Sequence, residues 1–362
     1  MRERTVKLLA TVSLVAVGFV GFELVSGYVS WLRSSGGKYG SLNLLENVAE
    51  RLNSSSGQAS NTTVTRTHLP STGISPHPAW GWWRLPNSRV VTTYRSSNGK
   101  EYSFETSTDD EGRRLTTHVC EPEDYSLWVF GDSYLEGSGL NDESVFTSLL
   151  ASAVPGLCVQ NYAAGGYGNT HALQQINLLK TQGVDPPDSI LVGYGDYYLE
   201  RNVAAPSRIK TYTLDDKDYS GSGFSPADFT HPRARLEGET LVLDKVPLFW
   251  DERRSDLYNL SVEEQQLVSM KVLESIHASA ADWGVQQMFL AYISGGIGDP
   301  VVEAARRSGF VIIDLRGNLG SQIDYDYVPL DSHPGYLAHS FYARKIMNQL
   351  ELMKLPLVPG IN

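Results

Sequence analysis

Short apolar runs alternate with helical stretches from residue 127 onward, and this alternation constrains the fold more than any other feature of the chain. We expect strands over residues 127–130, 158–162, 189–194, 287–292 and 310–315. Strands separated by helices are typical of a parallel sheet that helices cover on both faces. The sequence therefore predicts an α/β fold with a doubly wound, mainly parallel sheet.

One of the intervening helices is marked at both ends. Ser261 and Glu264 have the spacing of a capping box, in which each side chain binds the backbone N–H of the other residue. Apolar residues then recur at helical spacing until Gly284, a residue type that commonly ends helices. We predict a helix between Ser261 and Gly284.

A candidate nucleophile follows the first expected strand directly, in Gly131-Asp132-Ser133. Ligands in doubly wound folds bind at the carboxyl ends of the strands, where Ser133 would lie. A serine hydroxyl is a poor nucleophile unless an imidazole accepts its proton, and a carboxylate that fixes the imidazole tautomer helps. About 200 residues later, Asp331 and His333 precede the last helical segment. We predict Ser133 as nucleophile, His333 as base and Asp331 as acid.

Two neighbours of these residues have other expected roles. Asp132 is expected to hold its turn by local hydrogen bonds rather than to transfer protons. His339 lies inside the last helix and is expected to make a structural hydrogen bond. His333 instead comes just before that helix, whose N-terminus disfavours the imidazolium form and keeps the base neutral.

Small residues follow two further strands, in Gly165-Gly166 and in Gly193-Tyr194-Gly195. Glycines at such a position let backbone N–H groups point into a cleft and stabilise a developing oxyanion. A glycine-rich turn alone is weak evidence, because glycine also serves ordinary βα turns.

The order of these blocks resembles that of the SGNH or GDSL-type esterases and acyl hydrolases over roughly residues 127–350. The resemblance implies an SGNH/flavodoxin-like fold, with Ser133 as nucleophile and its own N–H as an oxyanion donor. It also implies Gly166 as the second oxyanion donor and His333 as the base. The chain would be a membrane-tethered, bacterial-like member.

The third block departs from the family pattern. Family members carry an asparagine whose side chain completes the oxyanion hole, and the corresponding residue here is Gly195, followed by Asp196. We expect this strand end at the site, with Asn202 or Asn169 as candidates for the missing donor.

The last block also departs from the family pattern. Family members usually place the acid three residues before the histidine, where this chain has Leu330, whereas Asp331 is two residues before it. His333 would then be oriented by a hydrogen bond to Asp331 or, in a Ser-His dyad, by one to a backbone carbonyl.

The N-terminal residues 1–32 are expected to be a signal-anchor or transmembrane segment. Basic residues precede the uncharged runs 8–22 and 24–32, which together could span a membrane, although Glu23 separates them. A cleaved signal peptide is the alternative. Either reading places the catalytic domain outside the cytoplasm, in the periplasm or the extracellular space.

Residues 33–75 are rich in polar and small residues and are expected to form a flexible linker. Residues 76–118 read as a small β appendage, with a hairpin turn at Asn98-Gly99. The cluster of Trp80, Trp82 and Trp83 either stacks on a sugar or, more commonly for such aromatics, closes the core of the appendage.

Residues 119–362 are expected to form the hydrolase domain, with a cap-like insertion at 197–260 that contains a hairpin over residues 235–244. The insertion either covers the cleft or decorates the surface. The two cysteines, Cys120 and Cys158, either pair in an oxidising compartment or remain buried thiols.

Composition excludes several classes of function. The formal net charge is -11 and no Lys/Arg-rich block is present, which argues against a nucleic-acid partner. We find no phosphate loop, no dinucleotide fingerprint after a strand and no His-Glu-x-x-His motif, so we expect no cofactor and no metal.

The sequence thus predicts a serine hydrolase that cleaves an ester through an acyl-enzyme. Its substrate would be a small-molecule or glycan ester, such as an O-acyl group on an envelope or extracellular glycan. An O-acyltransferase with the same Ser133 and His333, and a catalytically inactive glycan-binding protein of an envelope assembly, are the alternatives.

Overall fold

The structure is a computed structural model, and its description begins at residue 64. The described residues are 64–70, 73–97, 99, 101–212, 224, 228–248, 251, 253–316 and 333–353. The expected membrane segment at 1–32 and most of the expected linker lie outside them, as does Asp331. None of the helices in the described ranges combines the length and the apolar character that a bilayer crossing needs.

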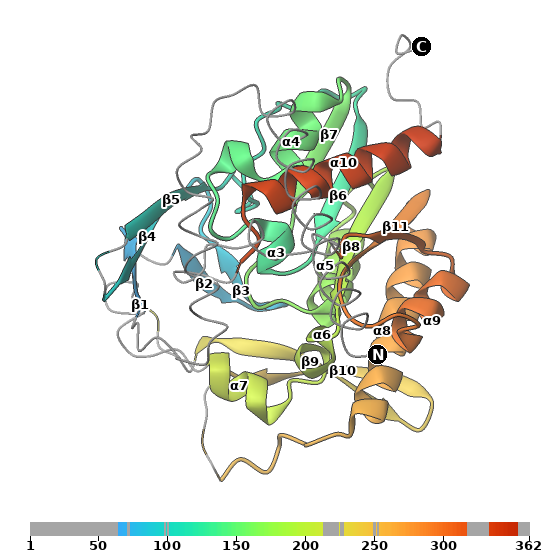
Figure 1. The fold of residues 1–362 in the computed structure, drawn as a ribbon. Helices are drawn as coiled ribbons and strands as arrows, with labels where there is room; N and C mark the ends of the chain where they lie inside the picture. Colours follow the sequence, from blue (N-terminus) through green and yellow to red (C-terminus); the bar gives the residue numbers. More distant parts are fainter. Residues whose placement is uncertain are drawn as a thin grey trace, which may run out of the picture. The chain divides into compact units, whose positions relative to one another are not determined.

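A five-stranded parallel sheet forms the centre of the molecule (Figure 1). Its strands are β6 (Tyr125–Phe130), β7 (Leu157–Asn161), β8 (Ser189–Gly195), β11 (Gln287–Ser294) and β12 (Val311–Asp314). They lie in the order β12-β11-β8-β6-β7, and every pairing is parallel. If these five strands are renumbered in chain order, the sheet read from β7 has the order 2-1-3-4-5. This is the flavodoxin-like arrangement of a doubly wound fold. The predicted α/β class is confirmed, and each of the expected strands is present.

Helices cover both faces of this sheet. The helices of the described residues are α3 (Ser133–Glu136), α4 (Phe146–Ala153), α5 (Asn169–Thr181), α6 (Tyr198–Asn202), α7 (Pro206–Tyr212), α8 (Val262–Trp283), α9 (Pro300–Ser308) and α10 (Tyr336–Leu352), with a short 3-10 helix η1 (Asp142–Ser144). Side chains of α5, α8 and α9 pack on one face, and those of α4 and α10 pack on the other.

The alternation of side chains along the strands explains this arrangement. In β6, Leu127 and Val129 pack toward α4 and α10, whereas Trp128 and Phe130 pack toward α5 and α8. All four are buried, because successive residues of a strand point to opposite faces and both faces are covered.

Helix α8 has the predicted ends. The Ser261 hydroxyl accepts a hydrogen bond from the Glu264 N–H at 3.2 Å, and the Glu264 carboxylate accepts one from the Ser261 N–H at 2.8 Å. Gly284 follows the helix with a φ of 111°, in the left-handed region that glycine adopts without strain.

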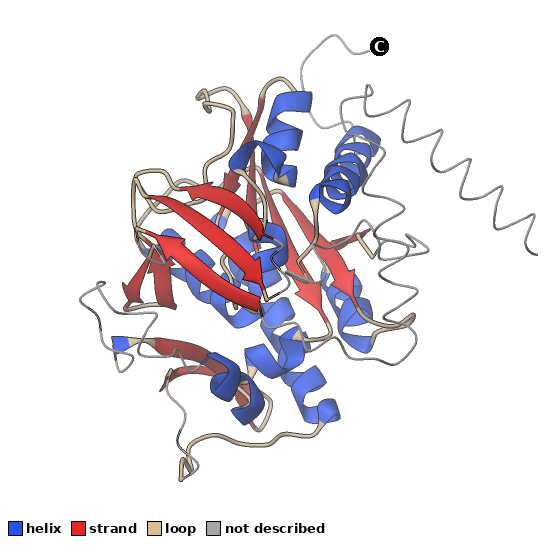
Figure 2. Ribbon diagram, turned by 60° about the vertical axis from the view of Figure 1, so that its left-hand side comes forward, coloured by secondary structure: helices blue, strands red, loops and turns tan. Residues whose placement is uncertain are grey.

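The appendage contains two small antiparallel sheets on one flank of the parallel sheet (Figure 1 and Figure 2). One has the order β1-β4-β5, formed by Val64–Leu69, Arg89–Ser96 and Glu101–Ser107. The other pairs β2 (Ile74–His77) with β3 (Gly81–Arg84). The expected linker is therefore too long at its C-terminal end, because β1 and the start of β2 fall within residues 33–75.

The tryptophans of the appendage are buried. Trp80, Trp82 and Trp83 are each 7% exposed and belong to the same core cluster as the helices α5 and α8. Residues 62–362 form one compact unit, so the appendage shares its core with the parallel sheet. The three rings are buried as expected, but in a core shared with the parallel sheet rather than in a core of the appendage alone, and Trp82 also lines the cavity described below.

The predicted hairpin of the insertion is present. Strands β9 (Thr230–Glu237) and β10 (Thr240–Pro247) pair antiparallel around a turn at Gly238. Strand β9 approaches β3 so closely that a Cβ on Gly81 would collide with the Thr230 carbonyl oxygen. The insertion therefore packs against the appendage at this point.

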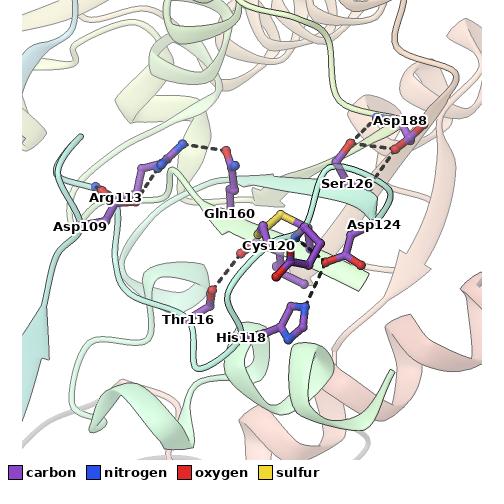
Figure 3. Close-up of a disulfide and its surroundings, with 12 residues drawn as sticks. Asp109, Arg113, Thr116, His118, Cys120, Asp124, Ser126, Gln160 and Asp188 are labelled. Atoms are coloured by element: carbon purple, nitrogen blue, oxygen red, sulfur yellow. Dashed lines mark hydrogen bonds and ion pairs between the residues drawn. A yellow bond between two sulfur atoms is a disulfide. The ribbon is translucent and has the colours of Figure 1, made fainter. Parts of the chain in front are cut away.

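Cys120 and Cys158 form a disulfide, with their Cα atoms 4.9 Å apart (Figure 3). It joins the segment before β6 to the second residue of β7. The same segment is held by a hydrogen bond between His118 and Asp124 and by one from Arg113 to Gln160 on β7. Of the two alternatives for the cysteines, the structure contains the paired one. The connection between appendage and sheet is thus fastened to β7.

Candidate active site

Ser133 lies where the central strand β6 passes into helix α3. Gly131 and Asp132 form the turn, and the Asp132 carboxylate caps α3 by accepting the Tyr134 N–H at 3.0 Å. A Cβ on Gly131 would lie 2.7 Å from the Leu135 side chain, so only glycine allows α3 to pack this closely on the strand end. This tight turn fixes where the Ser133 side chain starts.

The turn stands at the switch point of the sheet. Strands β6 and β8 are neighbours whose outward connections run in opposite directions, and ligands of doubly wound folds bind between such strands. A Cβ on Gly193 of β8 would lie 2.8 Å from Leu135 and 3.5 Å from the Gly131 Cα. The two strand ends therefore meet beneath α3.

Asp132 is fully buried and has partners on both carboxylate oxygens. One oxygen accepts the Tyr134 N–H, and the other accepts a hydrogen bond from the Arg201 guanidinium at 2.7 Å. The Asp132 N–H donates to the Tyr198 hydroxyl at 3.0 Å. These bonds confirm that Asp132 holds the turn.

Arg201 connects three strand ends. It belongs to α6, which follows β8, and it binds Asp132 after β6 and the Tyr167 carbonyl after β7, the latter at 2.9 Å. Its guanidinium also stacks over the Tyr197 ring at 4.6 Å. The pKa of Arg201 is raised because, although burial disfavours its charge, Asp132 and neighbouring tyrosines more than offset that effect.

A second buried arginine connects the appendage to α3. Arg84, the last residue of β3, donates to the Glu136 carboxylate at 2.7 Å and to the Ala163 carbonyl at 2.7 Å. Arg84 is 6% exposed and Glu136 is 12% exposed. Glu136 follows Ser133 by one helical turn, so this ion pair holds helix α3 against the appendage.

Ser133 and His333 line one cavity of about 670 Å³. Ser133 is 8% exposed there, and the His333 ring packs edge-on to the ring of Tyr134, with centroids 5.7 Å apart. His333 lies just before Gly335, the N-cap of α10. The two residues that the sequence analysis paired therefore line the same cavity.

The predicted oxyanion turn also borders this cavity. Gly165 and Gly166 line it, and a Cβ on Gly165 would lie 4.0 Å from the Ser133 Cβ. Gly166 has a φ of 82°, which only glycine adopts freely. The predicted donor Gly166 thus lies in the turn beside the nucleophile, with Gly165 nearer to Ser133.

The other predicted residues lie elsewhere. Asp196 is exposed and accepts from Ser294 at 2.8 Å, and Gly195 packs against Tyr197. The Asn202 amide is fully buried and donates to Ser269 at 3.0 Å and to Asn169 at 3.4 Å. None of these three predicted residues is among those that line the cavity.

The two asparagines proposed for the missing donor are thus used inside the protein. Asn169 donates its own amide to the Gly193 carbonyl at 2.7 Å, which ties α5 to the end of β8. The structure does not bring the Asn169 or Asn202 amide to Ser133, and Asp331 lies outside the described residues.

His339 is a structural residue, as expected. It is fully buried and accepts the Phe146 N–H at 3.2 Å. Burial, and to a smaller extent the nearby charge of Arg114, lowers the pKa of His339 to about 3. Two more buried histidines, His171 and His231, likewise have lowered pKa values, chiefly because of burial.

Sequence analysis missed the residues that hold the site together. Arg84, Glu136 and Arg201 line the cavity. Glu136 could have been noticed, because its position one turn after Ser133 puts both on one side of a helix. The arginines carry no such local signal, because their partners lie 52 and 69 residues away in the chain.

Within the described ranges, no group of three or more His, Cys, Asp or Glu side chains is placed to hold a metal ion.

Comparisons with known proteins give structural similarities only. No protein-family model matches the chain. No curated protein matches it. Among solved structures, TesA is 15% identical with a TM-score of 0.39, over 63% of this chain and 99% of that one.

Two further solved structures are similar at the same level. A member of the lipolytic G-D-S-L family from Veillonella parvula is 13% identical with a TM-score of 0.36, over 62% of this chain and 96% of that one. The acetylxylan esterase Axe2 from Geobacillus stearothermophilus is 14% identical with a TM-score of 0.35, over 67% and 99% of the two chains.

Proposed function

We propose that this protein is a serine-dependent ester hydrolase. The observation that supports the proposal is that Ser133 and His333 line one cavity at the switch point of the sheet, although about 200 residues separate them in the chain. A serine on a tight strand-to-helix turn and a histidine at the same cavity are the minimum that acyl transfer requires.

The reaction would proceed through an acyl-enzyme. The Ser133 hydroxyl attacks the ester carbonyl carbon while the His333 imidazole takes its proton, and the carbonyl oxygen becomes an oxyanion. The N–H groups of Ser133 and of the Gly165-Gly166 turn would stabilise this charge. The intermediate then expels the alcohol, which receives the proton from His333. Water adds to the acyl-enzyme by the same route and releases the acid.

An acyl group on an extracytoplasmic or envelope glycan is the substrate that we propose. The Cys120–Cys158 disulfide supports an oxidising compartment, where such glycans occur. The N-terminal sequence, with its basic residues and uncharged runs, supports export and a membrane tether.

The decisive experiment is labelling with a fluorophosphonate probe. The parent protein should be labelled and should cleave p-nitrophenyl acetate, and Ser133→Ala should lose both, with a fall in kcat of about 10⁴-fold or more. Ser138→Ala is the matched control, because Ser138 lines the same cavity but donates to Glu136 at 3.2 Å. Equal turnover by Ser133→Ala and the parent would refute the proposal.

A glycan-binding protein without catalysis is the second candidate. The glycine at position 195 favours it, since the family's side-chain donor is missing there and neither Asn169 nor Asn202 replaces it. Glycan binding by a parent protein that the probe does not label would support this function instead.

Transfer to a sugar hydroxyl in place of water uses the same residues. Acetate release in the presence and absence of a glycan acceptor separates the two reactions. A hydrolase releases acetate at the same rate in both, whereas a transferase moves the acetyl group onto the acceptor.

A further inference from the structure

The catalytic cavity has a second wall that is made by the appendage. The inward face of the β1-β4-β5 sheet lines the same cavity as Ser133. Its lining residues are His68, Val90, Thr92, Tyr94, Phe104 and Thr106. The register pairs Thr92 with Phe104 and Val90 with Thr106, so these side chains form one continuous surface.

The two faces of this sheet differ in charge. Arg89, Arg95, Glu101 and Glu105 alternate with the inward residues and form exposed ion pairs on the opposite face. The inward face of β4 and β5 carries hydroxyls, aromatic rings and one aliphatic side chain, and no charge. Because side chains alternate along a strand, the strand pattern itself separates a solvent face from a cavity face.

The wall is held in place relative to Ser133. The Tyr102 hydroxyl donates to the Gly139 carbonyl at 2.5 Å, and the Glu105 N–H donates to Asn141 at 2.9 Å, both just after α3. On the other side, Arg84 of β3 binds Glu136 of α3. The sheet and the nucleophile helix are therefore joined at several points, and the cavity between them has a defined width.

The lining chemistry indicates what would fit. Among the lining residues, Ser88, Thr92, Thr106 and Thr211 carry hydroxyl groups, and Trp82, Tyr94, Phe104 and Tyr212 carry aromatic rings. The charged arginines of the lining are in ion pairs, Arg84 with Glu136, Arg201 with Asp132 and Arg208 with Glu200. Hydroxyls beside aromatic rings suit a neutral sugar, whose ring has apolar faces and a polar rim.

We infer that the inward face of the β1-β4-β5 sheet binds the alcohol part of the ester, and that this part is a neutral sugar. The inference rests on the proposed function, because it assigns the two sides of one ester to two walls of one cavity. A cavity of about 670 Å³ is far larger than an acetyl group requires, and it lies in the usual range for ligand sites, about 300–1,000 Å³.

The test compares three acyl esters. They are p-nitrophenyl acetate, a mono-O-acetylated methyl glucoside and p-nitrophenyl octanoate. The double substitution Thr92→Val/Thr106→Val keeps the shape of the wall and removes two hydroxyls. We expect kcat/KM for the acetylated glucoside to fall about 10-fold, with p-nitrophenyl acetate changed less than about 2-fold, since each lost hydrogen bond is worth about 0.5–1.5 kcal/mol.

Thr93→Val is the matched control. Thr93 belongs to the same strand but points to the other face, where its hydroxyl lies 2.7 Å from that of Ser103. It should leave all three rates unchanged. Thr106→Val alone is the second variant, because Thr92 also binds His68 at 2.9 Å and its loss could disturb folding. Circular dichroism shows whether each variant is folded.

The outcomes separate this inference from the proposed function. Equal losses on the glucoside and on p-nitrophenyl acetate, or no loss on either, would overturn the sugar subsite while leaving the hydrolase in place. A parent that prefers the octanoate would also overturn it, since the wall would then hold an acyl chain. Failure of the hydrolase itself would show as absent labelling of Ser133 in the parent protein.

Discussion

The two walls of the cavity are built in different ways. Ser133, Gly166 and Arg201 lie on connections that follow three strands, and hydrogen bonds between these connections hold them. The opposite wall is the face of a regular antiparallel sheet, whose ladder depends on backbone groups alone. The loop wall therefore depends on the identity of its residues, whereas the sheet wall can change side chains without losing its framework.

The largest effect of a substitution is expected at the loop wall, where the reacting groups would lie. His333→Ala should lower kcat/KM for p-nitrophenyl acetate by at least about 10³-fold, because Ser133 would lose the group that accepts its proton. His339→Asn is the control, since its amide oxygen can still accept the Phe146 N–H. Steady-state kinetics of both variants gives the two values of kcat/KM. A His333→Ala enzyme that kept most of its rate would remove this histidine from the mechanism.

A smaller effect, on stability, should follow from replacing Arg201, the arginine that joins the strand ends. Arg201→Met leaves the fully buried Asp132 carboxylate without its cation, and we expect a loss of about 3–5 kcal/mol in the free energy of unfolding. Arg84→Met should cost less, because Glu136 is 12% exposed and keeps Ser138 as a donor. Urea denaturation measures both.

The double variant Asp132→Asn/Arg201→Met tests whether the unpaired charge of Asp132 causes the loss of stability in Arg201→Met. Asparagine is as good a helix cap as aspartate and carries no charge, so the double variant should be more stable than Arg201→Met alone. If both had the same stability, the buried charge would not be the source of the loss.

Because of the buried histidines, we expect the free energy of unfolding to fall gradually as the pH is lowered. The pKa of His339 is lowered to about 3 and that of His231 to about 4, from an ordinary value of 6.5. Between pH 6.5 and these values, the unfolded chain binds protons that the folded protein does not. Each histidine should therefore lower the free energy of unfolding by about 1.4 kcal/mol per pH unit as the pH falls through this window.

Thermal unfolding at pH 7, 6 and 5 measures this slope. His339→Asn should show a shallower dependence on pH than the parent, whatever its stability at pH 7. Parallel curves for the two proteins would mean that His339 is not the group that takes up the proton.

The fold was largely predictable because its strands are buried on both faces and leave apolar runs that helices separate. Strand β1 was missed for the converse reason. It is an edge strand whose Thr65 and Thr67 are exposed, so its composition resembles that of a linker, and only its pairing with β4 reveals it.

The residues of the candidate site were predictable only as far as its blocks are local. Ser133 follows β6 directly, and His333 comes just before α10, so both can be recognised from neighbouring residues. Arg84 and Arg201 act on partners that are distant in sequence, and a single chain carries no pattern for such pairs. Gly195 stands where the resemblance leads one to expect a side-chain donor, but where a substitute would lie depends on packing that the sequence does not describe.

The alternation along β4 and β5 has a consequence for how chains of this kind diverge. Residues at every second position of these strands line the cavity, and their neighbours lie on the opposite face of the sheet. If this wall binds the alcohol as we infer, point changes at the inward positions retune which alcohol is accepted and leave Ser133 and His333 untouched. Related chains that share the Gly-Asp-Ser turn need not share a substrate.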